Sequence, residues 1–213
     1  MLFRSRGFKN GVKVQKTALG DDTCVAGMYL NYASYFGADV ECLKPVVDYI
    51  FQGELSDGGF NCMWDRSGAI HSSLHTTLSV LEGFHSYLQA GYAYQAGRIE
   101  RSMRACAEFM LEHRLFRSSR TGEIIDEKFL RMTYPFRWKF TVLRALSCLA
   151  DIGMRHDPRM DDALEYVQSK RQKDGLWKLQ SKFPGEEFFA MEPVGKPSRM
   201  VTFLCLKALK RFG

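Results

Sequence analysis

Apolar positions recur at intervals of three and four residues along most of the chain, the spacing of one face of an α-helix. Segment 159–171 carries a one-sided apolar stripe, while 140–150 is apolar nearly all round. The stripe in the first of these consists of Met160, Ala163, Leu164 and Val167. The pattern requires no strand and predicts seven helices, over residues 24–36, 40–52, 71–89, 98–114, 136–152, 159–171 and 197–212.

The chain also repeats itself. LKPVVDYIFQGELSDGGFNC (43–62) and DDALEYVQSKRQKDGLWKL (161–179) align without a gap, which pairs Gly58 with Gly175 and Phe60 with Trp177. A third copy over 105–123 lies between them, and we expect its glycine–aromatic turn to have decayed. The repeat predicts helix pairs that are joined by similar turns.

Each pair combines an amphipathic helix with a following helix that is apolar nearly all round. The amphipathic members suit an outer shell and the apolar members an inner shell. We therefore predict an all-α fold of the α/α-toroid type, as a complete ring or an arc, with an open α-solenoid as the alternative. The predicted domain covers residues 20–213 and follows a basic lead over residues 1–19.

The turns carry a resemblance to a known superfamily. QKDGLW (172–177) resembles the QW repeat of squalene and oxidosqualene cyclases, and DGGF (57–60) is similar to it. Together with the helix pairs, the turns resemble the terpenoid cyclase/protein prenyltransferase α/α-toroid superfamily over about residues 20–213. Segments 117–138 and 195–209 resemble an uncharacterised bacterial squalene-cyclase-like group.

This resemblance implies a protein that acts on or binds an isoprenoid, or another apolar ligand with an anionic head. As an enzyme it would be an isoprenoid transferase or cyclase. A complete ring of the superfamily needs more helices than the seven predicted here. We therefore expect a partial toroid that forms a homodimer or lacks upstream helices. The alternatives are a non-catalytic binding or scaffold module and a C-terminal half-domain of a longer toroid.

The charge and composition of the chain limit the kinds of partner and the cellular location that we expect. The chain has 213 residues and a net charge of +6, but its cations are scattered and form no block with interleaved aromatics, so no nucleic-acid partner is expected. No apolar run reaches the length of a transmembrane helix. The six cysteines form no CxxC pair and the N-terminus does not resemble a signal peptide, which predicts reduced thiols in a cytoplasmic protein.

A zinc site is predicted where the inner helices begin. Aligning these helices on their small central residues gives Cys24 and His75 the same repeat position, and Asp22 lies two residues before Cys24. Carboxylate, thiolate and imidazole are zinc ligands, and a set of three leaves an open catalytic position. Asp22-Thr23-Cys24 and His75 are also similar to the Asp-x-Cys pair and later histidine of protein prenyltransferase β subunits.

Other interpretations of these residues stay open. A different metal set would use Cys62 or His71. In a purely structural role, Asp22 caps a helix, Cys24 packs in the core, and His75 bonds a neighbouring turn.

A catalytic acid is predicted from LGDDTC (19–24), which resembles the DxDDTA segment of squalene-hopene-type cyclases. The resemblance implies that Asp21 protonates an alkene, although Leu19 stands where that segment has its first aspartate. The alternative is that Asp21 or Asp22 caps the helix.

A diphosphate clamp is predicted from the cluster Arg137, Trp138 and Lys139 and from Arg199, all placed at expected inner-helix starts, where anions bind. Solvated cations are the alternative. Segment 186–197 is the longest irregular stretch, and it is interpreted as a lid or as a connector.

Overall fold

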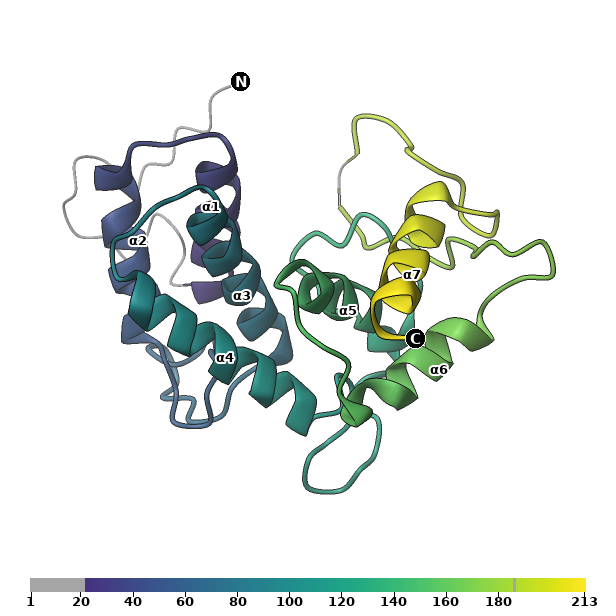
Figure 1. The fold of residues 1–213 in the computed structure, drawn as a ribbon, viewed down its shortest axis with the longest axis horizontal. Helices are drawn as coiled ribbons and strands as arrows, with labels where there is room; N and C mark the ends of the chain where they lie inside the picture. The colour runs from purple at the N-terminus through teal and green to yellow at the C-terminus, as the bar shows by residue number, and fades with distance from the viewer. Residues whose placement is uncertain (1–21, 186) are drawn as a thin grey trace. The chain divides into compact units, whose positions relative to one another are not determined.

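The computed structural model describes residues 22–185 and 187–213, and these residues form seven α-helices (Figure 1). Within these ranges there is no strand, only four isolated bridges. The helices are α1 (Thr23–Tyr35), α2 (Val40–Gln52), α3 (Leu74–Gln89), α4 (Ala96–Glu112), α5 (Val142–Asp151), α6 (Asp161–Ser169) and α7 (Arg199–Phe212). Short 3-10 turns occupy Glu127–Leu130 and Pro158–Met160. The predicted all-α class and number of helices are confirmed.

The chain divides into two compact units, Met1–Phe109 and Met110–Gly213. The predicted basic lead lies outside the described residues. No helix in the described ranges combines the length and hydropathy that a membrane span requires.

In the first unit, α1 packs against α3 and α2. The α1–α3 contact is close because glycines lie in it. A Cβ on Gly27 would stand 2.6 Å from the carbonyl oxygen of Ser79, and a Cβ on Gly83 would overlap the carbonyl oxygen of Gly27. These two helices therefore touch backbone to backbone.

In the second unit, α7 packs against α5 and α6. The two predicted helix classes are visible here. Eight of the ten residues of α5 are buried, whereas α6 buries only Ala163, Leu164 and Val167 of its nine. The apolar and the amphipathic helix thus differ in burial as their sequences predict.

The repeated turns before α3 and α7 have the same backbone hydrogen bonds. The turn glycine donates to the carbonyl three residues earlier, at 3.1 Å for Gly58 and 2.9 Å for Gly175. Both glycines have a positive φ, +88° and +84°, a conformation that other residues rarely adopt. The repeat in the sequence is therefore a repeat of structure.

The aromatic residue after each turn joins it to the next helix. Its N–H donates to a threonine hydroxyl at 3.0 Å, and its carbonyl accepts from the N-cap serine of that helix at 2.8 Å. These sets are Phe60, Thr77 and Ser73 before α3, and Trp177, Thr202 and Ser198 before α7. Both aromatics are fully buried. The predicted alignment of α3 with α7 is confirmed.

The third copy of the turn is retained, contrary to part of the prediction. Gly122 has a φ of +74° and donates to the Ser118 carbonyl at 2.8 Å, and Ser118 donates to the carbonyl of Glu123 at 2.8 Å. The turn is one residue longer than the other two. Ile124 takes the place of the aromatic and is 37% exposed. The aromatic has been lost, as expected, but the turn has not.

Helix α5 begins at Val142 rather than at 136, so the predicted start is wrong. Thr141 caps this helix by accepting from the N–H of Arg144 at 3.2 Å. The residues before it have other partners: Met132 accepts from the N–H of Gln180 at 2.8 Å, and the Lys139 carbonyl accepts from the guanidinium of Arg144 at 3.0 Å. Arg137 has a φ of +53°, which a right-handed helix cannot contain.

Candidate functional site

The first candidate site lies in the unit Met1–Phe109, where α1 and α3 begin beside the loop over residues 53–73. Hydrogen bonds between the first and the last part of this loop hold it in place. Asp57 accepts from the N–H of Ser72 at 2.7 Å, and the amide of Asn61 donates to the His71 carbonyl at 2.8 Å. Cys62 follows Asn61 directly, so the anchored turn determines where this sulfur lies.

Cys62 and Cys24 meet at this point. The backbone N–H of Cys24, in the first turn of α1, donates to the Cys62 sulfur at 3.3 Å. The hydroxyl of Thr76, in the first turn of α3, lies 3.2 Å from the same sulfur. Because the Cys24 N–H reaches the Cys62 sulfur, the thiol of Cys24 lies close to that of Cys62. Two helix starts therefore converge on one half-buried sulfur.

This arrangement separates the acidities of the two thiols. Donation from the Cys24 thiol, with further donors from Thr76 and the Cys24 N–H, lowers the pKa of Cys62 to about 6 against the opposing effect of burial. The same hydrogen bond and burial raise the pKa of Cys24 far above its ordinary value. Cys62 is therefore the more acidic thiol of the pair.

Alkylation should reveal this difference. We expect the iodoacetamide reaction of Cys62 to rise as the pH passes about 6 and to level off near neutrality, because the reactive thiolate is then fully formed. Peptide-resolved alkylation rates between pH 5 and pH 9 would measure it. Thr76→Val, which removes one donor, should move the midpoint upward. A midpoint for wild-type Cys62 near the ordinary thiol value of 9.0 would contradict the assignment.

The predicted zinc ligands are distributed around this pair. Asp22 holds the N-cap position of α1, but its side chain makes no cap hydrogen bond and instead pairs with the guanidinium of Arg66. His75 is the second residue of α3 and is partly exposed. Within residues 22–185 and 187–213, no group of three His, Cys, Asp or Glu side chains could hold a metal ion. Zinc at Asp22, Cys24 and His75 stays a prediction, and Asp21 lies outside the described residues.

The sequence identified Cys62 only as an alternative ligand. The signal that marks it is its position directly after the DGGFN turn, since that turn is bonded to the start of α3. Its contact with Cys24 is long-range, across 38 residues, and no local pattern predicts such a contact.

The second candidate site lies in the unit Met110–Gly213. The cluster Arg137, Trp138 and Lys139 precedes the N-cap of α5 instead of starting the helix. Trp138 is 42% exposed, and the Lys139 ammonium lies 3.5 Å from the centre of its ring. Arg199, in contrast, is the first residue of α7, as predicted.

The start of α7 already holds a carboxylate. Glu192, from the segment before the helix, accepts from the N–H of Arg199 at 2.9 Å and from the Ser198 hydroxyl. It also lies 3.4 Å from the N–H of Met200. An anion site at this helix start was expected, and the chain supplies an anion of its own. Sequence reasoning did not single out Glu192.

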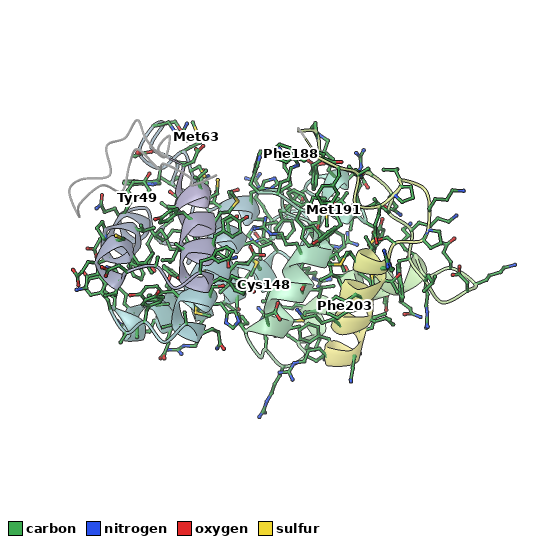
Figure 2. All side chains as sticks on the ribbon, turned by 90° about the horizontal axis from the view of Figure 1, so that it is seen from above. Tyr49, Met63, Cys148, Phe188, Met191 and Phe203 are labelled. Atoms are coloured by element: carbon green, nitrogen blue, oxygen red, sulfur yellow. The ribbon has the colours of Figure 1, made fainter. Side chains whose placement is uncertain are left out.

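One stripe of α7 is exposed along its whole length. It consists of Arg199, Phe203, Leu206 and Lys210, spaced as one helix face. Phe203 is 60% exposed and Leu206 is 45% exposed, although the other apolar side chains of the helix are mostly buried. Figure 2 labels Phe203 on this helix. The stripe is apolar at its centre and carries a cation at each end.

Comparison with known proteins gives no relative for this chain: no protein-family model matches the sequence, and no curated protein matches it.

Proposed function

We propose that the chain is a helix-pair protein of the partial α/α-toroid type that binds an apolar, isoprenoid-like ligand with an anionic head. The observation that carries this proposal is the exposed stripe of α7. An inner helix that presents Phe203 and Leu206 to the outside offers an apolar track. Arg199 stands at one end of it, where a guanidinium can pair with a phosphate.

The geometry of α7 suits such a ligand. Arg199 and Leu206 are seven residues apart, which corresponds to about 10 Å along a helix. An extended isoprenoid chain can lie along this distance with its head at Arg199. Two of the three repeated turns support the toroid-type arrangement, because the turns before α3 and α7 each tie a buried aromatic to the helix that follows.

Calorimetric titration of the full chain tests the proposal with three probes: farnesyl diphosphate, farnesol and inorganic diphosphate. We expect farnesyl diphosphate to bind most tightly. Phe203→Ser should weaken both isoprenoids about tenfold, a loss of about 1.4 kcal/mol. Arg199→Gln should weaken the two probes that carry a diphosphate by about three- to tenfold and leave farnesol unchanged.

Lys210→Gln is the matched control, since it removes a cation from the far end of the same stripe. Equal losses for Arg199→Gln and Lys210→Gln would show a non-specific charge effect. If neither farnesyl diphosphate nor farnesol showed saturable binding, the proposal would be refuted.

A second candidate function is assembly, in which the chain completes its ring with a second copy or with further helices. The end of α1 favours it, because Tyr35 and Phe36 are 80% and 81% exposed. Light scattering on the titrated samples separates the two functions. A concentration-dependent dimer without ligand binding would support assembly.

A further inference from the structure

We propose that Cys24 and Cys62 form a peroxide-sensitive dithiol, in which Cys62 attacks a hydroperoxide and Cys24 resolves the product as an intramolecular disulfide. The inference does not depend on the ligand proposed for α7. It rests on the 3.3 Å contact between the Cys24 N–H and the Cys62 sulfur, and on the groups that surround this sulfur.

The surroundings of Cys62 favour attack by its sulfur. Donors from two helix starts point at it: the N–H of Cys24 at 3.3 Å and the hydroxyl of Thr76 at 3.2 Å. The first turns of helices carry a partial positive charge that stabilises a thiolate. The side chain of Cys62 is also partly exposed, so a small peroxide can reach it.

Cys24 is placed as the resolving thiol. It is 8% exposed, which keeps it from the solvent, but its backbone N–H lies 3.3 Å from the Cys62 sulfur, which places the two side chains next to each other. A resolving cysteine must reach only its partner. Burial thus makes Cys24 a poor first target and leaves it able to take part in the second step.

The chemistry balances with a hydroperoxide as the oxidant. The Cys62 thiolate attacks one peroxide oxygen, the O–O bond breaks, and Cys62 becomes a sulfenic acid as hydroxide or alkoxide leaves. The Cys24 sulfur then attacks the sulfenic sulfur and gives up its proton, and water leaves as the S–S bond forms. With hydrogen peroxide, two thiols and one peroxide give one disulfide and two waters.

The other cysteines differ from this pair in position. Cys106, Cys148 and Cys205 are buried on α4, α5 and α7, and Cys42 is half-buried on α2. Burial also raises the pKa of Cys106 and Cys205, which opposes thiolate formation. Selective oxidation of Cys62 and Cys24 is therefore the expected outcome of limited peroxide treatment.

The disulfide would join the first turn of α1 to the loop after the DGGF turn and close a loop of 38 residues. Such a cross-link restricts the unfolded chain. We expect oxidation to raise the unfolding temperature of the unit Met1–Phe109 by about 10 °C.

The test is peptide mapping of the full chain after treatment with one equivalent of hydrogen peroxide, with a chelator present so that bound metal cannot protect the thiols. Digestion without reductant should yield linked peptides containing Cys24 and Cys62, two hydrogens lighter than the separate peptides. In Cys24→Ser, dimedone should instead trap a sulfenic acid on Cys62.

Cys42→Ser is the matched control, since it removes a half-buried cysteine of the same unit and should leave the linked peptides unchanged. Wild-type protein that accumulates dimedone adducts on Cys62 without a disulfide would overturn the role of Cys24. Oxidation that begins at Cys42, or that is equal at all six cysteines, would overturn the proposal.

Discussion

Trp177→Ala is expected to lower the free energy of unfolding of the unit Met110–Gly213 by about 3–5 kcal/mol. The indole is fully buried, and its N–H donates to the Val167 carbonyl at the end of α6 at 2.7 Å. The Trp177 backbone N–H also donates to the hydroxyl of Thr202 on α7. Alanine would leave a large cavity and remove one of the two hydrogen bonds to the Val167 carbonyl, which would keep only the bond from the Lys170 N–H at 3.2 Å. The unfolding temperature should fall by about 10–20 °C.

Hydrogen exchange should locate this effect, with the largest increase in amide exchange in α6 and α7. Leu176→Ala is the matched control, because Leu176 lies in the same turn but is 40% exposed. It should cost less than about 1 kcal/mol. Equal losses from the two variants would show that the buried aromatic does not stabilise the helix pair.

Gly27→Ala is expected to destabilise the unit Met1–Phe109 by about 1–3 kcal/mol. The added methyl would meet the backbone of α3 at Ser79 and Val80, which cannot move aside as the end of a flexible side chain can. Alanine favours helices over glycine by about 1 kcal/mol, so helix propensity alone predicts the opposite sign. Chemical denaturation followed by circular dichroism would measure the difference.

Gly97→Ala separates the two effects, since Gly97 lies in α4 and a methyl there would approach only the flexible end of Arg101, at 3.8 Å. This variant should be neutral or stabilising. If Gly27→Ala also stabilised the protein, the close contact between α1 and α3 would be refuted.

The helices could be predicted from the sequence because their period is local and strong. Six of the seven begin within three residues of the predicted position, and the exception is α5. Its predicted first turn, around Pro135, contains bulky apolar residues that also suit a helix. Long-range hydrogen bonds determine the conformation of this segment instead: the side chain of Gln180 accepts from the N–H of Met132, 48 residues away. A single sequence carries no sign of that pairing.

The candidate sites were predictable only in part, for the same reason. Alignment of the inner helices placed Cys24 and His75 near helix starts, and both lie there. Arg66, which pairs with Asp22 across 44 residues, was not foreseen. The Cys24–Cys62 contact was missed as a pair because it depends on how the loop over residues 53–73 folds back on α1.

The Glu192 carboxylate occupies the start of α7 and would compete with any anionic ligand that binds there. A carboxylate tethered a few residues from its site has a local concentration in the millimolar range or above. A ligand with a single negative charge would exchange one carboxylate for another and gain little. A diphosphate, with more charge and more oxygens, could engage Arg199 while it displaces Glu192. The tether would therefore act as a threshold that selects ligands by the charge of their heads.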